Sequence, residues 1–187
     1  MTDKHSPLGF HWMLDTSFFP VARSPERERL VALHETGRIK LAETDVLDTE
    51  LTNARPDIRA VFEIEAAKFS EYLGPLVLDH SRLGHAVLGS KLDQSLLDEV
   101  VGLLFPGKTS LKAKPHDVRD AMHIAWAKRY GFDGFITEDQ RLLRKKAVLK
   151  ARLSFDILSP VEALTIAERF SRKAEIRESS RSDQHRP

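Results

Sequence analysis

The sequence predicts an α/β protein in which a parallel sheet of about five strands is covered by helices on both faces. Two observations predict this class. Short apolar runs, typical of buried strands, alternate along the chain with longer segments whose apolar residues recur near helical spacing. Strands that alternate with helices in this way form parallel sheets with helices on both faces. At 187 residues the chain has room for one such domain and a sizeable core.

The first half of the chain is expected to supply three strands. The predicted strands are Phe10–Leu14, which Asp15 closes, Ile39–Glu43, and Leu76–Leu78 after Gly74-Pro75. Ser24 and Pro25 predict the start of a helix that runs to about His34 and ends at Gly37. A second helix is expected from about Asp45 to Pro56, and a third over Asp57–Leu73.

The second half continues the alternation. Helices are predicted over Ser81–Leu88, Ser90–Phe105, His116–Tyr130 with Gly131 at its end, Asp139–Leu149 and Pro160–Phe170; strands are predicted around Phe135-Ile136 and over Phe155–Leu158. Residues 1–170 are therefore expected to form a single domain with extra helices around 83–105. Residues 171–187 are polar and charged without an apolar period, which predicts a disordered tail.

Composition excludes several kinds of site. The chain has no cysteine, so disulfides, thiolate metal sites and cysteine nucleophiles are excluded. The formal net charge is +1, so net charge gives no sign of a strongly basic nucleic-acid binder. No apolar run approaches the roughly 18 residues of a membrane span, and no signal peptide is recognisable. We expect a soluble, cytoplasmic protein with no membrane contact.

Several acids are predicted at one edge of the sheet. Asp15 follows the first strand, Asp139 follows the fourth, and Glu50 lies on the helix after the second strand. Asp117 and Asp120 are three residues apart at the start of a helix and can face the same way. Because ligand sites of parallel sheets collect at the carboxyl ends of the strands, these acids are candidates for one site.

Clustered carboxylates repel one another unless a cation neutralises them. Oxygen ligands without cysteine favour Mg²⁺ or Mn²⁺. Such ions clamp phosphates and activate a bound water for attack at phosphorus. The cluster therefore indicates a two-metal, water-mediated nuclease, although each acid taken singly could also be a helix cap or a first-turn acid.

Four segments in this order resemble the PIN-domain family. They are Met13-Leu14-Asp15-Thr16-Ser17, Leu47-Asp48-Thr49-Glu50-Leu51, Arg119-Asp120-Ala121-Met122-His123-Ile124-Ala125-Trp126-Ala127 and Gly134-Phe135-Ile136-Thr137-Glu138-Asp139. The resemblance spans roughly residues 10–160 and implies a Rossmann-like sheet. It also implies that Asp15, Glu50, Asp120 and Asp139 form an acidic metal-binding quartet, with Thr16 and Thr137 supporting it.

Proteins of this family are typically Mg²⁺- or Mn²⁺-dependent ribonucleases. Many are the toxin of a toxin–antitoxin pair, blocked by an antitoxin and often dimeric. The resemblance therefore implies RNA, single-stranded or structured, as the substrate, an antitoxin protein as a possible partner, and a homodimer. This chain is longer than the compact toxins, with its extra length around Leu83–Pro115 and in the tail.

Some assignments stay open between neighbouring residues. Glu43, Asp45 and Asp48 lie close to Glu50 and could take its place if the helix phase differs. Asp117 could replace or assist Asp120. His123, three residues after Asp120, could orient a carboxylate, touch the substrate or be structural. Glu138 is expected to point away from Asp139, because adjacent helical residues do not share a face.

Two basic stretches flank the acids. Lys108, Lys112 and Lys114 precede Arg119, and Lys114 and Arg119 are candidates to hold the RNA backbone; the alternative is a solvated loop. Arg141 and residues 144–146 form a second stretch, for which a solvated helix face is the default.

The sequence also suggests two alternative functions. A PIN-like scaffold could bind RNA or protein without cutting, but no acid of the quartet is missing. A receiver-type or phosphatase-type domain could use Asp15 as a phosphoryl acceptor. Haloacid-dehalogenase-like phosphatases need a second Asp two residues later, where this chain has Ser17.

Overall fold

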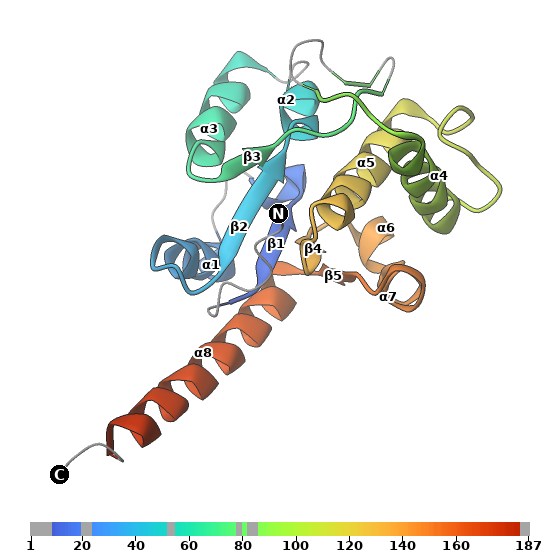
Figure 1. Ribbon diagram of the computed structural model, residues 1–187. Coiled ribbons are helices and arrows are strands. Elements are labelled where there is room, and N and C mark those ends of the chain that lie inside the picture. Colours follow the sequence, from blue (N-terminus) through green and yellow to red (C-terminus); the bar gives the residue numbers. More distant parts are fainter. Residues whose placement is uncertain (1–8, 20–23, 52–54, 78–79, 82–85, 184–187) are drawn as a thin grey trace.

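The computed structural model describes residues 9–19, 24–51, 55–77, 80–81 and 86–183, with side chains up to residue 172. Its centre is a sheet of five parallel strands in the order β3-β2-β1-β4-β5 (Figure 1). The strands are β1 (His11–Leu14), β2 (Lys40–Thr44), β3 (Ser70–Tyr72), β4 (Gly134–Ile136) and β5 (Asp156–Leu158). The predicted α/β class with a parallel sheet is confirmed.

The central strand β1 contributes to the core on both faces of the sheet. Trp12 pairs with Leu41 of β2 on one side and with Gly134 of β4 on the other. Successive strand residues point to opposite faces, and Trp12 and Leu14 pack into one apolar core while Met13 packs into the second. All three side chains are almost fully buried, which explains why this run is apolar without alternation.

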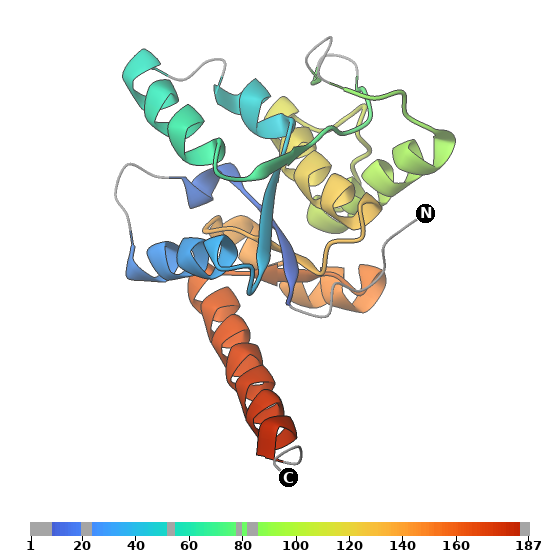
Figure 2. The same ribbon diagram turned by 60° about the vertical axis from the view of Figure 1, so that its left-hand side comes forward.

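Helices cover both faces (Figures 1 and 2). The core that contains Met13 is closed by α4 (Lys91–Leu104), α5 (Pro115–Arg129) and α7 (Lys146–Leu153). The core that contains Trp12 is closed by α1 (Pro25–Glu35), the end of α3 (Pro56–Ala66) and the start of α8 (Pro160–Asp183). The short helix α2 (Val46–Leu51) follows β2, and a 3-10 turn, η1 (Thr16–Phe18), follows β1.

Several helix ends follow directly from the sequence. Ser24 caps α1 by accepting a hydrogen bond from the Arg27 amide at 3.3 Å, with Pro25 in the first position. Ser90 and Asp93 form a reciprocal capping box at the start of α4. Gly131 follows α5 with a φ of +75°, a conformation that glycine adopts without strain.

The prediction for the third strand is wrong. The strand is Ser70–Tyr72, and α3 ends at Ala66 instead of continuing to Leu73. Leu76 and Val77 are not in a strand, Leu78 lies outside the described residues, and Pro75 makes an isolated bridge to Val87. β3 is an edge strand whose Ser70 and Glu71 are exposed, so it carries no apolar run that would mark it.

Three helix predictions also need correction. Of the predicted helix Ser81–Leu88, residues 81 and 86–88 are not helical, and residues 82–85 lie outside the described part. The helix expected over Asp139–Leu149 is divided into α6 (Gln140–Leu143) and α7. The helix that starts at Pro160 continues to Asp183, where a disordered tail was expected; residues 184–187 are not described.

The extension of α8 has a physical basis in composition. Residues 171–183 contain no glycine or proline, and about half of them are Arg, Glu, Lys or Ala, which have high helix propensity. A helix can therefore continue without the apolar period that tertiary packing requires. In both views α8 runs away from the sheet (Figures 1 and 2). No helix in the described residues is both long and apolar enough to cross a bilayer.

Candidate active site

The four acids of the predicted quartet come from four different elements to the carboxyl edge of the sheet. Asp15 follows β1, and its amide donates to the Ile136 carbonyl at 2.9 Å, so it lies beside the end of β4. Asp139 follows β4 and caps α6. Glu50 lies on α2 and Asp120 on the second turn of α5. The parallel topology thus places side chains over 100 residues apart in sequence at one edge.

Two hydroxyl groups fix the Asp15 carboxylate. Thr137 and Ser17 both donate to its Oδ2, each at 2.6 Å. The Ser17 hydroxyl accepts from the Glu138 amide at 2.9 Å, and the Thr137 hydroxyl accepts from the Asp139 amide at 2.9 Å. The supporting role implied for Thr137 therefore corresponds to a direct contact. Ser17 was missed as a supporting residue, although its place two residues after Asp15, at a strand end, could have indicated it.

Glu50 is held by one hydroxyl and one histidine. Its Oε2 accepts a short hydrogen bond from the Thr16 hydroxyl and lies 3.5 Å from Nε2 of His123. Its Oε1 lies 3.6 Å from Nε of Arg119, a buried nitrogen with no hydrogen-bond partner among the described residues. Burial opposes ionisation of Glu50, but the His123 and Thr16 contacts and the Arg119 charge lower its pKa below the usual value.

Asp120 and Asp139 share one guanidinium. Nη2 of Arg141 lies 3.1 Å from Oδ2 of Asp120 and 2.8 Å from Oδ2 of Asp139. The Arg141 amide and Nε also donate to Asp139, at 2.7 Å to Oδ1 and 3.1 Å to Oδ2. The solvated face expected for the second basic stretch therefore does not describe Arg141, because α6 starts immediately after Asp139 and turns this arginine back onto the acids.

The charged side chains at the carboxyl edge of the sheet shift one another's pKa values. Burial raises the pKa of Asp120 to about 6, and the negative charges of Asp15 and Glu50 add to this effect against the opposing charge of Arg141. Burial disfavours protonated His123, but its contact with Glu50 and the charges of Asp15 and Asp120 raise its pKa above the usual value. Asp15, Glu50 and Asp120 thus form one electrostatic cluster.

His123 links this cluster to the core. The ring is fully buried, and its Nδ1 lies 2.7 Å from the hydroxyl of Thr44 at the end of β2. Its other nitrogen faces Glu50. His123 is therefore placed to orient a carboxylate, the first of the roles that the sequence left open, while its burial removes it from direct contact with a large substrate.

Asp117 is not brought into the cluster. Its carboxylate lies 3.1 Å from Nζ of Lys108 and 3.0 Å from Nε2 of His116. Burial opposes ionisation of Asp117, but the hydrogen bond from Lys108 and the contact with His116 outweigh that effect and lower its pKa below the usual value. Lys114 is exposed at the N-cap of α5, where its carbonyl accepts from the Val118 amide.

The acids near Glu50 in sequence have other surroundings. Asp45 is buried and its Oδ1 accepts from the Gly74 amide at 3.0 Å, so it fixes the chain after β3. Burial raises its pKa to about 6. Glu43 lies within β2, and the side chain of Asp48 is outside the described residues. Of the acids in this stretch whose side chains are described, Glu50 is the one held by Thr16 and His123.

The donor chemistry of the cluster fits a hard divalent cation. Hydrogen bonds among the described residues occupy Oδ2 of Asp15 and of Asp120 and leave Oδ1 of each open, and Oε1 of Glu50 makes none. Oxygen donors of this kind suit Mg²⁺ or Mn²⁺. In the present arrangement no three His, Asp or Glu side chains of the described residues are grouped closely enough to hold an ion. Binding would therefore require the side chains to draw together.

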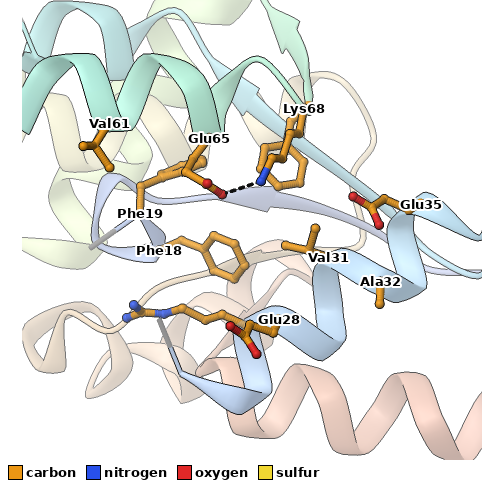
Figure 3. A pocket seen from close by; sticks show the side chains of 11 residues that line it. Phe18, Phe19, Glu28, Val31, Ala32, Glu35, Val61, Glu65 and Lys68 are labelled. Atoms are coloured by element: carbon orange, nitrogen blue, oxygen red, sulfur yellow. Dashed lines mark hydrogen bonds and ion pairs between the residues drawn. The ribbon is translucent and has the colours of Figure 1, made fainter. Parts of the chain in front are cut away.

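An apolar pocket lies next to the edge, between α1 and α3 (Figure 3). Its volume is about 530 Å³, and the rings of Phe18, Phe19 and Phe69 line it. Arg27 lines the pocket and also reaches the site, where it donates to the Ser17 carbonyl at 3.2 Å and pairs with Glu138. The expectation that Glu138 points away from Asp139 agrees with this pairing. Neither the pocket nor the role of Arg27 could be predicted from local sequence patterns.

Comparisons with known proteins do not identify a family for this chain. No model of a known protein family matches the chain, and no curated protein matches it. The resemblance to the PIN domain therefore depends on the four quoted segments, and the function must be argued from the site.

Proposed function

We propose that the protein is a metal-dependent endoribonuclease that hydrolyses RNA phosphodiesters at the carboxyl edge of its sheet. The observation that carries the proposal is the cluster of Asp15, Glu50 and Asp120. Three acids from separate elements hold open oxygens in mutual electrostatic range, and burial together with the charges of Asp15 and Glu50 raises the pKa of Asp120 to about 6. An arrangement that costs stability in the free protein is typical of a site that binds a cation.

Each residue has a definable task in this proposal. Asp15, Glu50 and Asp120 would hold Mg²⁺ or Mn²⁺. When bound, the ion supplies neutralisation of the phosphate charge and a lowered pKa for a coordinated water. Thr137 and Ser17 fix Asp15, and Thr16 and His123 fix Glu50, so that the carboxylates keep their orientation. Asp139 belongs to the same edge through its contacts with Arg141.

Cations around the site support a polyanionic substrate. Arg119 has a buried Nε without a hydrogen bond among the described residues, and its side chain is 28% exposed, so it can reach a phosphate. Lys114 is exposed one helical turn earlier. Phosphate contacts of this kind position a nucleic acid without reading its sequence. Lys108 is less available, because it pairs with Asp117.

The first experiment measures cleavage of a mixed single-stranded RNA pool by the purified full-length protein with Mn²⁺, Mg²⁺ or EDTA. The test variant is Asp120→Asn, and the matched control is Asp57→Asn, which removes an exposed first-turn acid of α3. We expect metal-dependent cleavage by the wild type and the control, and none by Asp120→Asn. Cleavage that persists in EDTA or in Asp120→Asn would contradict the proposal.

One observation favours a second candidate, a scaffold that binds RNA or protein without cutting. Arg141 already neutralises Asp120 and Asp139, and no three ligand side chains of the described residues are grouped for an ion. RNA that is bound but left intact with every metal would support this candidate. The same samples therefore separate the two functions.

The partners implied by the PIN resemblance extend the proposal. A toxin role would require an antitoxin protein, which a small open reading frame beside the gene would indicate. A homodimer would appear in light scattering of the purified chain.

A further inference from the structure

We propose that Arg141 is the second cation of this site, so that the site takes one divalent ion and Asp139 serves as the anchor of Arg141 instead of as a metal ligand. The inference rests on the proposed nuclease function and changes the two-metal mechanism that the sequence led us to expect. The four carboxylates differ in how many of their oxygens already accept hydrogen bonds.

Asp139 is saturated within its own segment. Both of its oxygens accept hydrogen bonds from Arg141: Oδ1 from the amide at 2.7 Å, and Oδ2 from Nε at 3.1 Å and from Nη2 at 2.8 Å. The hydrogen bonds from Arg141, and then its charge, lower the pKa of Asp139 against the effect of burial. A carboxylate offers about four acceptor positions, and most of those on Asp139 are used. An ion at Asp139 would have to displace the cap of α6.

The other three acids are open. Among the described residues, Asp15 and Asp120 each leave Oδ1 without a hydrogen bond, and Glu50 leaves Oε1 in the same state. Their contacts come from hydroxyl groups, from His123, from Arg119 and from Nη2 of Arg141. They can therefore accept an ion without breaking a helix cap.

The charge balance also fits a single ion. Asp15, Glu50, Asp120 and Asp139 carry four negative charges, and Arg119 and Arg141 lie against them with two positive charges. These six side chains leave two negative charges, or one if His123 is protonated, so one divalent cation is enough to balance them. A second divalent ion would instead compete with Arg141 for Asp120 and Asp139.

Arg141 has donors left for a substrate. Its side chain is half exposed at the mouth of the site, and Nη1 makes no hydrogen bond to any described residue. A guanidinium held by two carboxylates presents its remaining N–H groups in a fixed direction, and phosphate oxygens are suitable acceptors. Arg141 can therefore stabilise the charge that develops on the phosphate as water attacks, a task that would otherwise fall to a second metal ion.

The test compares Mn²⁺ binding with RNA cleavage in the same full-length proteins. Isothermal titration gives the number of ions and their affinity, and a labelled single-stranded RNA gives the rate. The variants are Asp120→Asn, Asp139→Asn, Arg141→Gln and the double variant Asp139→Asn/Arg141→Gln. Arg144→Gln is the matched control, because it removes an exposed arginine three residues further on. Thermal unfolding of each protein checks that it is folded.

The expected results separate the roles. The wild type binds one Mn²⁺, and Asp120→Asn weakens its affinity by about tenfold or more. Arg141→Gln lowers the cleavage rate about 100-fold but raises Mn²⁺ affinity, because a positive charge beside Asp120 is gone. Damage to the fold would not move these two quantities in opposite directions. Asp139→Asn keeps Mn²⁺ affinity within about threefold, and the double variant cleaves no more slowly than Arg141→Gln, since the two residues act as one unit.

Two Mn²⁺ ions per wild-type chain would overturn the inference. So would a loss of Mn²⁺ affinity in Asp139→Asn as large as that in Asp120→Asn, or weaker Mn²⁺ binding by Arg141→Gln. In these cases cleavage by the wild type would still stand, and the proposed nuclease with it. A wild type that neither binds Mn²⁺ nor cleaves RNA would overturn the proposed function and this inference together.

Discussion

The first two turns of α5 carry two aspartates with opposite surroundings. Asp117, in the first turn, faces Lys108 and His116, and these contacts hold its pKa below the usual value against the effect of burial. Asp120, one turn later, is partly buried, and burial together with the charges of Asp15 and Glu50 raises its pKa to about 6 despite Arg141. The residues are of the same type, on the same helix, and three positions apart.

Under the proposed function, this difference separates a structural acid, Asp117, from an acid of the site, Asp120. A carboxylate with cationic partners stabilises the folded state and needs nothing further. A carboxylate held against other carboxylates destabilises the folded state, and such groups are concentrated at functional sites. If this interpretation is right, replacing Asp117 and Asp120 must give opposite results for stability and unequal results for activity.

The largest expected effect is on RNA cleavage. Asp15→Asn removes the charge of the acid that Thr137 and Ser17 orient, and we expect the Mn²⁺-dependent rate to fall about 1,000-fold or more, because an essential metal ligand is lost. Asp117→Asn should retain cleavage within about threefold, since Asp117 contacts Lys108 and His116 rather than the cluster. Single-turnover rates on one labelled RNA give both numbers. Equal losses in the two variants would remove the distinction between them.

The second effect is on stability in EDTA, and its sign differs between the two variants. The folded-state pKa of Asp120 is raised, so its cost to stability appears as pH rises from about 4 to about 6 and is complete above that range. Asp120→Asn should therefore raise the free energy of unfolding at pH 8 by about 2 kcal/mol, allowing for partial exposure, and by almost nothing at pH 4. Urea denaturation at the two pH values measures this.

Asp117→Asn should do the reverse. Its folded-state pKa is lowered, so its stabilisation is present above the unfolded value and is lost as pH falls through the folded value. We expect Asp117→Asn to lower the free energy of unfolding at pH 8 by about 1 kcal/mol, with a smaller loss at acid pH. A stabilising Asp117→Asn, or a destabilising Asp120→Asn, would show that the pairing seen in the structure does not control stability.

The parts of the fold that the sequence predicts best are those that are buried. β1, β2, β4 and β5 are found within a residue or two of their expected positions, because a strand covered on both faces must be apolar. β3 was missed because it is an exposed edge strand of sequence Ser-Glu-Tyr. The extension of α8 was missed for a related reason, since it projects from the domain and its helix depends on propensity without a buried face.

The site shows the same limit at the level of side chains. Strand ends locate Asp15 and Asp139, and helical spacing puts Asp120 and His123 on one side of α5, so the acids could be predicted. Their partners could not. Arg141 turns back onto Asp120 because α6 begins at Asp139, and Arg27 reaches Ser17 from a different helix. Contacts of this kind depend on where helices begin and how they cross, and neither follows from local sequence patterns.

The smallest expected effect is on the stability of an Asp45 variant. It separates the cost of burying an acid from the cost of repulsion between acids. Asp45 also has a pKa raised to about 6, but burial is the main cause, and its carboxylate accepts from the Gly74 amide at 3.0 Å. Asp45→Asn should raise the free energy of unfolding by about 1 kcal/mol at pH 8 and by almost nothing at pH 4, because the folded-state pKa is raised and the amide oxygen retains a weaker hydrogen bond. Excess Mn²⁺ stabilises most the variant that binds it most tightly, so it should reverse the stability gain of Asp120→Asn over the wild type and leave that of Asp45→Asn unchanged. Urea denaturation with and without Mn²⁺ tests both variants. If Mn²⁺ removed the gain in unfolding free energy of both variants, Asp45 would belong to the site. If it removed neither gain, Asp120 would not be a metal ligand.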